Sequence, residues 1–445
     1  MANERSEMAY PVRLTKASKR AHKIGKEWYQ KALDYSKEGK DVAWCMAGVP
    51  PEFLVAFDIA GVWPENFGTV CAAYQTAVHF LEIAEKDGYS SELCSYERTM
   101  LGYIKELVDG GGEIPEAAPR GGMGRADMLL TSGLACDPRT KGFQALKRFF
   151  DVPFHVIDTP NPPPGSDYND PRLKDSYINY YVQELHELIQ FIENVTGKTY
   201  DDNRMRHIVE NSLESGRLIY DITEMRKHVP SPLPSEDYFG FVHLQLFMLG
   251  EDFVLEFYRE LKDEIKRNIK EGVSAIPQED FRICTMGLPP WYCLGIFNYM
   301  EKIGIAPVMD LAYFIGKPPD VDTTDPLRAL AEKAWKKIVD SRDFGGNEIS
   351  PEPWGIPDAS GSWPAGLLES WLEDYQLDGI VQFFTRSCRV TSFGGTHIRS
   401  VMAQKGVPVL TLEIDMADPR GWSDDRIKAE LDMFREVLEK AKQRA

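Results

Sequence analysis

Two widely separated stretches of the chain share one order of apolar and polar segments. Residues 42–62 contain a short apolar run, the turn Gly48-Val-Pro-Pro and an apolar pattern at helical spacing, and residues 281–305 repeat this order around Gly287-Leu-Pro-Pro. Proline is tolerated in the first turn of a helix, so the pattern predicts a strand, a turn and a helix in both places. The chain is therefore expected to contain two related halves.

A second pair of stretches strengthens this repeat. Residues 126–160 and 377–415 each consist of a predicted strand, a cysteine, a predicted helix, Val-Pro, another strand and an acidic residue. Strands that alternate with helices predict parallel sheets joined by right-handed crossovers. We therefore expect an α/β protein with two tandem doubly wound domains.

The segment between the halves has a different pattern. From about residue 170 to 275, apolar residues recur at helical spacing with charged residues between them, which predicts an all-helical region. We divide the chain into an N-terminal helical segment (1–40), a first α/β domain (41–165), a helical region (166–277) and a second α/β domain with a C-terminal helix (278–445). A length of 445 residues with 43% hydrophobic content agrees with more than one domain.

Charge and composition exclude several classes of function. The net charge is −18, and acidic and basic residues are mixed along the chain, so no basic patch favours binding to nucleic acid. The first forty residues lack the apolar core of a signal peptide, and no later stretch is long and apolar enough to span a membrane. We expect a cytoplasmic protein with no membrane partner.

The seven cysteines lack the paired short spacings of a disulfide framework. Cys136 and Cys388 follow predicted strands in the two halves, and ligands of open α/β sheets bind beyond the carboxyl ends of the strands. Cys94 is expected in the first turn of a helix capped by Ser90 or Ser91, where the helix dipole stabilises a thiolate. The remaining cysteines lie in apolar patterns and are expected to pack in the core: Cys45, Cys71, Cys284 and Cys293.

Three such thiolates suit an iron–sulfur cluster with one iron left open. Spacing does not establish one, because a single cysteine is more often a small buried apolar residue. The chain has no G-x-x-x-x-G-K-[ST] motif and therefore shows no Walker-type nucleotide site. Asp415 and Asp418 end the last predicted strand and are expected to cap the next helix, with contact to the ligand as the alternative.

Four strings carry a family resemblance. In chain order they are "WPEN" (63–66), "GYSSELCSY" (88–96), "TRSCR" (385–389) and "EIDMADPRGW" (413–422). Together they resemble the 2-hydroxyacyl-CoA dehydratase and benzoyl-CoA reductase family, over nearly the whole chain. The strings "PSPLPSEDYFG" (230–240) and "DTTDPLRALAE" (322–332) are closer to the larger cluster-bearing subunit of the ATP-dependent benzoyl-CoA reductases.

The resemblance implies two flavodoxin-like domains, a helical part and a 4Fe-4S cluster on three cysteines. Carried over by position, the metal ligands are Cys94, Cys136 and Cys388, with the fourth iron open to water or to a thioester oxygen. Glu65 matches a catalytic carboxylate near the substrate, which positions the thioester or relays a proton. Two residues depart from the family: Ala47 stands where dehydratases usually have serine, and Arg389 where proline often follows the last cysteine.

The function that the resemblance implies is the iron–sulfur subunit of an ATP-dependent aryl-CoA (benzoyl-CoA) reductase, which passes low-potential electrons to a CoA thioester and dearomatises the ring. The alternative is the α-type subunit of an (R)-2-hydroxyacyl-CoA dehydratase that uses a ketyl radical. The implied partners are a second, homologous cluster-bearing subunit in a heterodimer, an ATP-hydrolysing iron–sulfur activator and the acyl-CoA or aryl-CoA substrate.

Electron transfer at such low potential is consistent with an energy source outside this chain. Ferredoxins supply electrons near −400 mV, whereas iron–sulfur potentials reach down to about −700 mV, a gap of roughly 7 kcal/mol for one electron. Two readings from other classes remain open from the sequence. One is a carrier or assembly scaffold for clusters, and the other is an α/β ligand-binding protein whose cysteines only pack.

Overall fold

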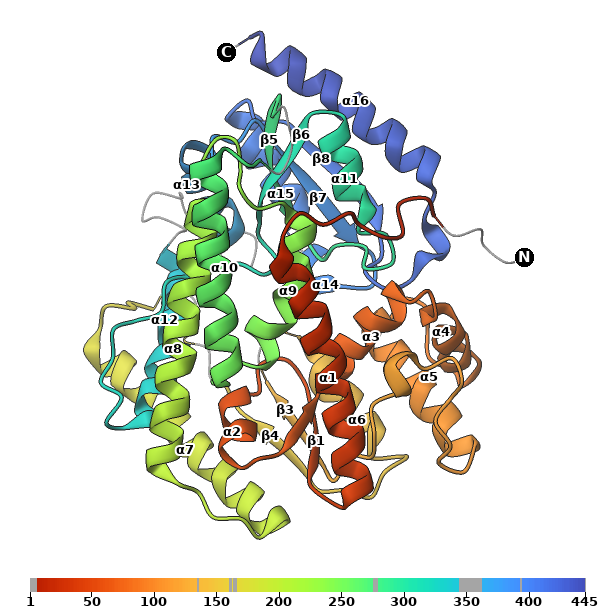
Figure 1. Ribbon diagram of the computed structural model, residues 1–445, viewed down its shortest axis with the longest axis vertical. Helices are drawn as coiled ribbons and strands as arrows, with labels where there is room; N and C mark the ends of the chain where they lie inside the picture. The colour runs from red at the N-terminus through yellow and green to blue at the C-terminus, as the bar shows by residue number, and fades with distance from the viewer. Residues whose placement is uncertain are drawn as a thin grey trace.

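The computed structural model describes residues 6–133, 136–159, 162, 166–274, 279–343, 362–392 and 394–444, with the side chains of 338–343 and 362–365 left aside. It contains two four-stranded parallel sheets (Figure 1). The first sheet has the order β2-β1-β3-β4 and the second has the order β6-β5-β7-β8. Both halves therefore follow the flavodoxin-like order, in which the second strand lies outside the first, and the predicted fold class is confirmed.

The strands are short and mostly buried. They are β1 (Val42–Cys45), β2 (Ala60–Val62), β3 (Met128–Ser132), β4 (Phe154–Ile157), β5 (Phe281–Met286), β6 (Ile305–Asp310), β7 (Gly379–Thr385) and β8 (Val409–Ile414). The central strands β1 and β5 are buried along their whole length. Helices cover both faces of a parallel sheet, so such strands carry continuous apolar runs instead of alternating ones.

Helices fill the connections within each half. In the first half they are α2 (Pro51–Ala56), α3 (Pro64–Ala73), α4 (Ala77–Lys86), α5 (Ser95–Asp109), the 3-10 turn η1 (Pro119–Gly121) and α6 (Asp137–Leu146). In the second half they are α11 (Gly295–Lys302), α12 (Pro326–Asp343), α13 (Ser362–Asp374), α14 (Arg389–Ser392), α15 (Gly395–Gln404), the 3-10 turn η2 (Pro419–Gly421) and α16 (Asp424–Lys442).

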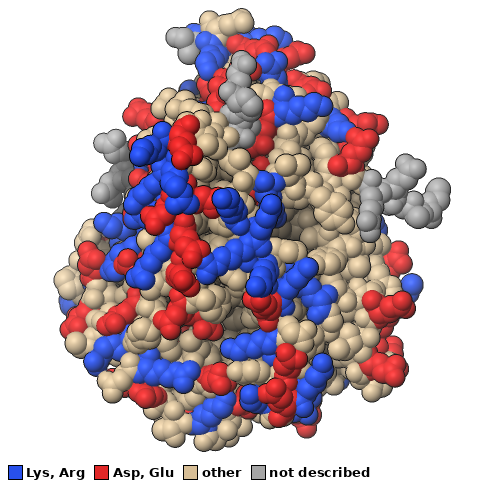
Figure 2. Space-filling view, viewed as in Figure 1, with Lys and Arg blue, Asp and Glu red and all other residues tan. Residues whose placement is uncertain are grey.

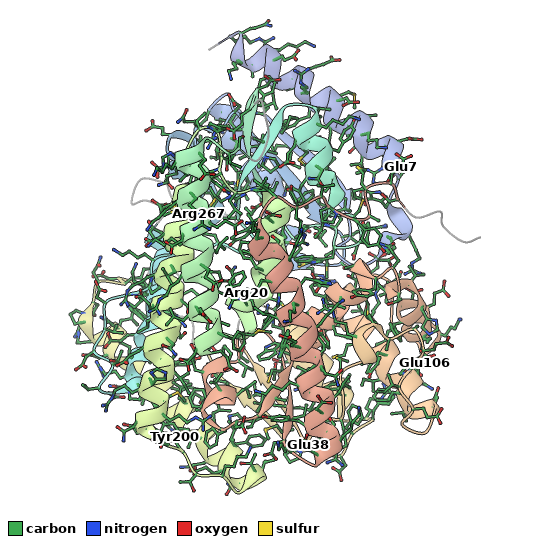
Figure 3. All side chains as sticks on the ribbon, viewed as in Figure 1. Glu7, Arg20, Glu38, Glu106, Tyr200 and Arg267 are labelled. Atoms are coloured by element: carbon green, nitrogen blue, oxygen red, sulfur yellow. The ribbon has the colours of Figure 1, made fainter. Side chains whose placement is uncertain are left out.

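The remaining helices join the two sheets. They are α1 (Lys16–Glu38), α7 (Pro171–Thr196), α8 (Asp202–Met225), α9 (Ser235–Phe247) and α10 (Asp252–Glu271). In Figure 1 α1 runs down the front of the molecule from the second sheet to the first, and α8 and α10 lie side by side to its left. Arg20 of α1, labelled in Figure 3, is hydrogen-bonded to Glu256 and Glu260 of α10. Helix α12 of the second half packs on α7 and α8.

The repeat is less regular than its sequence predicts at one point. Helix α2 begins at Pro51, directly after the first Pro-Pro turn, but α11 begins only at Gly295, five residues after Pro290. The N-terminal segment explains the delay, because Gly295 donates its N–H to the carbonyl of Met8 at 2.8 Å. A Cβ atom at Gly295 would lie 2.4 Å from that oxygen, so this approach requires glycine.

The surface agrees with the mixed charge of the sequence. Figure 2 shows acidic and basic side chains interspersed over the helices of the front face. None of the described helices is long and apolar enough to cross a membrane.

A buried ion pair connects the helical region to the second sheet. Arg226, just after α8, lies 2.8 Å from Asp310 at the end of β6, and both side chains are 1% exposed. Ser235 at the start of α9 donates to the same carboxylate at 2.9 Å. Arg226 also donates to the carbonyl of Pro307, and the Ser235 hydroxyl lies 3.0 Å from the same oxygen. Three elements thus share one polar network inside an apolar core.

We predict that Asp310→Ala lowers the free energy of unfolding by about 3–5 kcal/mol, because it leaves the charge of Arg226 buried and unpaired. The matched control is Asp320→Ala. Asp320 is 91% exposed and pairs with Arg217 at 3.2 Å, so its loss costs about 0–1 kcal/mol. Chemical denaturation of both variants measures the difference, and equal destabilisation would contradict the assignment.

Candidate functional site

The three singled-out cysteines occupy equivalent places next to helix N-termini. Cys94 is the residue before α5, Cys136 is the residue before α6, and Cys388 lies between β7 and α14. All three are free and partly buried, whereas the other four cysteines are fully buried. The expected division between core and candidate site cysteines is therefore confirmed as a difference in exposure.

The prediction of the helix start at Cys94 needs correction. Ser90 does not cap α5: its hydroxyl accepts the N–H of Glu92 in a local turn, and the helix begins at Ser95. Cys94 itself is therefore the N-cap residue. The N–H groups of Tyr96 and Glu97 donate to its sulfur, which places the thiol at the positive end of the helix.

One hydrogen bond joins the segments that carry Cys94 and Cys388. The N–H of Ser95 donates to the hydroxyl of Ser387 at 3.2 Å, and both residues are buried. Ser387 donates in turn to Asp415, whose other oxygen accepts the N–H groups of Ala417 and Asp418. Residues almost 300 positions apart in sequence are thus direct neighbours. Asp415 closes a turn in the loop after β8 and is not the N-cap of the next α-helix, α16, which is Ser423.

Ion pairs reinforce this junction between the halves. Arg98 of α5 is 1% exposed, pairs with Glu85 at 2.6 Å and lies 3.4 Å from Asp418. Arg420, which belongs to the second half, donates hydrogen bonds to the same two carboxylates, those of Glu85 and Asp418. Asp418 also caps η2 by accepting the N–H of Arg420. The network fixes the N-terminal part of α5 against the loop after β8.

Electrostatic interaction connects the third cysteine to the other two. Negative charge on Cys388 raises the pKa of Cys94 and of Cys136, so Cys388 lies within interaction range of both. Burial is the largest cause of the raised pKa at each. For Cys136 the pKa reaches about 11, because Arg139 lowers it less than burial raises it. The raised pKa values of Cys94 and Cys136 favour the protonated thiols, and metal binding would release those protons.

The donor set can be compared with what a metal group requires. Within the described ranges, no group of three or more His, Cys, Asp or Glu side chains is arranged to hold a metal ion. An iron–sulfur cluster sets a different requirement, because each thiolate binds a different iron and the sulfurs stay apart. Three free, partly exposed thiols in one electrostatic neighbourhood, with backbone N–H groups directed at two of them, match that donor set.

Glu65 lies in the first turn of α3, at the carboxyl edge of the first sheet. Its carboxylate accepts the N–H of Ala47 at 2.7 Å and the Nε of Arg139 at 3.0 Å. The side chains of Glu65 and Arg139 are 14% and 19% exposed. Arg139 stands one helical turn after Cys136, so the ion pair lies beside that thiol. Two strong donors hold Glu65 as a fixed carboxylate, which favours the positioning role over the proton relay.

Sequence reasoning missed several polar residues of this site. Arg139 could have been found from its helical spacing to Cys136. Glu97 is buried with no hydrogen-bond partner for Oε2, and burial, followed by the charge of Glu65, raises its pKa, which favours the neutral form of this acid. Tyr96 and Tyr313 also lie here: a charge on Cys388 raises the pKa of each hydroxyl, after the larger effect of burial. No motif marked these residues, because their neighbours come from distant segments.

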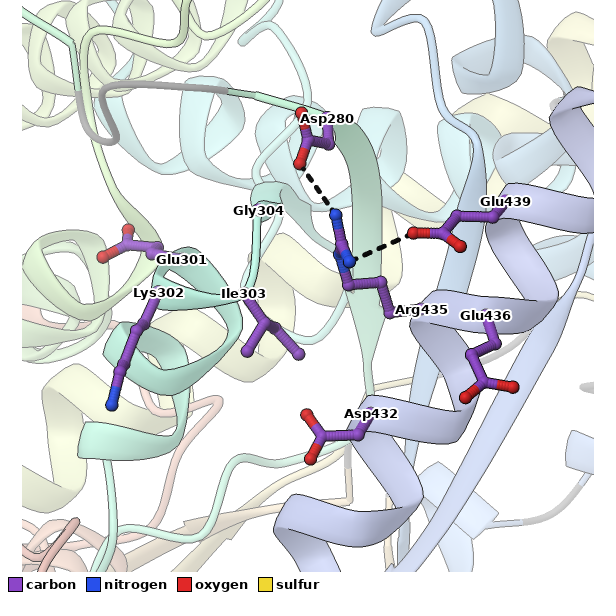
Figure 4. A pocket seen from close by; sticks show the side chains of 9 residues that line it. All are labelled: Asp280, Glu301, Lys302, Ile303, Gly304, Asp432, Arg435, Glu436 and Glu439. Atoms are coloured by element: carbon purple, nitrogen blue, oxygen red, sulfur yellow. Dashed lines mark hydrogen bonds and ion pairs between the residues drawn. The ribbon is translucent and has the colours of Figure 1, made fainter.

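The structure also has cavities away from the cysteines. A groove of about 850 Å³ lies between α16 and the amino ends of β5 and β6, lined by Asp280, Glu301, Asp432, Glu436, Glu439 and Arg435 among others (Figure 4). A smaller one of about 390 Å³ lies between α1 and the end of α9. The larger groove is at the edge of the sheet opposite to Cys388, and its arginine is paired with Asp280 and Glu439. We therefore place the candidate site at the cysteines, where the carboxyl ends of the strands lie.

Comparison with known proteins identifies the family of this chain. The family model described as 2-hydroxyglutaryl-CoA dehydratase, D-component, matches residues 46–438. The chain belongs to this family. It is similar to the (R)-2-hydroxyisocaproyl-CoA dehydratase alpha subunit of Clostridioides difficile, with 25% identity over 94% of each chain.

Two further relatives show the range of the family. The lactoyl-CoA dehydratase alpha subunit of Anaerotignum propionicum is 26% identical over 91% of this chain and 93% of its own. A benzoyl-CoA reductase subunit of Thauera aromatica is 25% identical over 90% of this chain and 89% of its own. This chain is thus about equally similar to the dehydratase subunits and to the reductase subunit. Membership in this enzyme family is shown, whereas the choice between the two reactions is not decided by similarity.

We predict opposite changes in Cys136 reactivity for two substitutions in the metal-free protein. Arg139→Met removes a positive charge and raises the Cys136 pKa further, whereas Glu65→Gln removes a negative charge and lowers it. Alkylation by iodoacetamide requires the thiolate, so its rate at pH 8 falls in the first variant and rises in the second, about tenfold per pKa unit. Mass spectrometry of the Cys136 peptide measures both rates, with buried Cys45 as the unreactive internal control.

Proposed function

We propose that this protein is the cluster-bearing subunit of an enzyme that passes low-potential electrons to a CoA thioester. One observation carries the proposal: the segments of Cys94 and Cys388 meet through the hydrogen bond from Ser95 to Ser387, and charge on Cys388 also acts on Cys136. These three cysteines would hold a 4Fe-4S cluster. When bound, the cluster supplies one-electron chemistry at low potential, and three protein ligands leave one iron open.

The residues around the cysteines have defined tasks in this proposal. Glu65, fixed by Ala47 and Arg139, orients the thioester. Glu97 holds a proton inside the protein, where no partner competes for its Oε2.

Two observations support assembly with a further subunit. The exposed apolar side chains of Leu93 and Val390, beside Cys94 and Cys388, favour a second subunit over the site. Some relatives are named as dehydratase alpha subunits, and two others are named as different subunits of the benzoyl-CoA reductase of Thauera aromatica. Such names belong to parts of multi-subunit enzymes, and we propose the same organisation for this chain.

Among the two reactions, we favour the reduction of an aryl-CoA such as benzoyl-CoA. Ala47 contacts the carboxylate of Glu65 through its backbone and offers no hydroxyl at a position where dehydratases usually carry serine. The second candidate, an (R)-2-hydroxyacyl-CoA dehydratase, is supported by the names of the relatives from Clostridioides difficile and Anaerotignum propionicum. Both need a separate ATP-hydrolysing activator as the electron donor.

We predict that the protein purified without oxygen is coloured and contains about four iron atoms per chain. Cys388→Ala loses most of this iron, whereas Cys293→Ala retains it, because Cys293 is buried away from the site and hydrogen-bonded to Ser6. Iron analysis and visible absorption measure both variants. A colourless wild-type protein, or unchanged iron in Cys388→Ala, would refute the ligand assignment.

We predict that turnover with benzoyl-CoA consumes ATP in proportion to product, because each reduced ring needs newly supplied electrons. A dehydratase recycles its electron, so ATP is needed only to start turnover. The measurement is ATP hydrolysed per product, in the complex with its activator, using benzoyl-CoA and (R)-2-hydroxyacyl-CoA thioesters in parallel. Many turnovers of a 2-hydroxyacyl-CoA per ATP would select the second candidate.

A further inference from the structure

The cavity between α1 and the end of α9 has the size and the walls of a small-molecule site. Its volume of about 390 Å³ lies within the range of roughly 300–1,000 Å³ that such sites occupy. One face of α1, helix α2 and the junction of α9 with α10 line it. Arg20, labelled in Figure 3, is among the lining residues. None of the three candidate cysteines lines this cavity, so it is separate from the candidate site.

An aromatic wall on one side of the cavity is in place before any ligand binds. Trp28 of α1 lines the cavity and is half-buried. Its ring stacks on that of Phe247, with the centroids 5.9 Å apart, and lies 5.5 Å from that of Trp63. Trp63 and Phe247 are buried, and their centroids lie 5.0 Å apart. The two buried rings therefore hold the accessible ring of Trp28 in a fixed orientation.

A second accessible ring comes from α10. Phe253 lines the cavity and is 38% exposed. Aromatic rings attract one another in offset or edge-on contacts beyond their apolar area. Trp28 and Phe253 thus favour a ligand that carries an aromatic ring.

Five charged side chains line the cavity, and only two of them have no charged partner. Arg20 is paired with α10, and Lys23 is paired with Glu27 at 3.6 Å. The side chains of Lys31 and Glu251 form no hydrogen bond and no ion pair with any residue in the described ranges. Their capacity to bind a charged group is therefore open to a ligand.

Lys31 and Glu251 lie beside the accessible rings. Lys31 is three residues after Trp28 on α1, so the two share a face of the helix. Its ammonium group lies 5.3 Å from the ring centroid of Tyr35. Glu251 is the N-cap residue of α10, two positions before Phe253, and its side chain makes no cap hydrogen bond. Both side chains are half-buried, so the cavity offers one cation and one carboxyl group next to aromatic surface.

We propose that this cavity binds a free aromatic amino acid. The ring of the ligand packs on Trp28 and Phe253, its carboxylate accepts hydrogen bonds from Lys31, and its ammonium group donates to Glu251. A ligand with a single charge leaves one of these two side chains without a partner in a half-buried place. A zwitterion therefore fits the cavity better than an aromatic acid or an aromatic amine. The inference goes beyond the proposed function and does not depend on the cysteines.

Isothermal titration of the full-length protein tests this inference. L-phenylalanine and L-tryptophan are the probes. Three analogues each lack one feature: 3-phenylpropionate lacks the ammonium group, 2-phenylethylamine lacks the carboxylate, and L-alanine lacks the ring. We expect at least one of the two probes to bind about tenfold or more tightly than each analogue, because each missing feature removes a charge-assisted hydrogen bond or the aromatic contact.

Two substitutions separate the two charges. Lys31→Met lowers the affinity for the aromatic amino acid about tenfold but does not lower that for 2-phenylethylamine, which has no carboxylate. Glu251→Gln lowers the affinity for the amino acid to a similar extent but does not lower that for 3-phenylpropionate. Both positions are partly exposed and neither side chain holds another element, so both variants are expected to fold. Circular dichroism checks this.

The matched control is Lys26→Met. Lys26 is an exposed lysine of the same helix that does not line the cavity, so its loss changes the net charge equally and leaves every affinity at the wild-type value.

Three results would overturn the inference. The first is that neither amino acid binds to the folded protein. The second is that the amino acids bind no more tightly than 3-phenylpropionate and 2-phenylethylamine, which would make the cavity a general apolar site, such as a contact for a side chain of another subunit. The third is an equal loss of affinity in Lys31→Met and Lys26→Met. Iron content and turnover do not enter these measurements, so their outcome is independent of the proposed function.

Discussion

The candidate site depends on the contact between the N-terminus of α5 and the loop after β7. The hydrogen bond from Ser95 to Ser387 connects the residues directly next to Cys94 and Cys388. Because Ser387 is in turn fixed by Asp415, the contact includes the end of β8 as well. A thiol from the first half and a thiol from the second half can face one group only while this contact holds. The ion pairs of Arg98 and Arg420 lie one helical turn away and keep the two surfaces in register.

The second constraint is charge. Glu65, Glu97 and three thiols lie close together in protein that disfavours charge, and burial accordingly raises the pKa of Cys94, Cys136 and Glu97. Arg139 offsets part of this through its pair with Glu65 and its proximity to Cys136. Helix N-termini add positive potential without adding a titratable group. Arg139 and the helix N-termini thus offset only part of the cost of forming a thiolate at Cys94 and Cys136.

The features that identify the family do not distinguish between its two reactions. The fold, the three cysteines and the carboxylate near the first sheet are compatible with dehydratases and with a reductase, and the similarity of this chain to both is close to 25%. Two side chains of this protein depart from the pattern that the family resemblance implies. Ala47 presents only its backbone to Glu65, and Arg389, which follows Cys388, is exposed in α14 and directs its charge to the surface. A common scaffold with small changes around one site fits the general rule that a fold alone does not specify a reaction.

Much of the fold followed from local pattern. The repeated order of strand, turn and helix predicted two parallel sheets with the same connectivity, because apolar runs of strand length and Gly-Pro turns are local signals. The all-helical segment between them was predicted for the same reason. Local signals failed where a distant segment intervened. The start of α11 moved to Gly295 because Met8, from the other end of the chain, occupies the space beside it.

For the site, the sequence alone determined which cysteines avoid the core and which strand ends carry them, since both depend on neighbouring residues. Only the tertiary structure decided that Arg139 pairs with Glu65, that Oε2 of Glu97 is buried without a partner, and that Trp291 of the second half donates to Tyr96 of the first. These contacts join residues from separate elements, and their energies depend on burial and distance. Neither quantity is encoded in the spacing of residues along the chain, because the sheets and the helices between them set both.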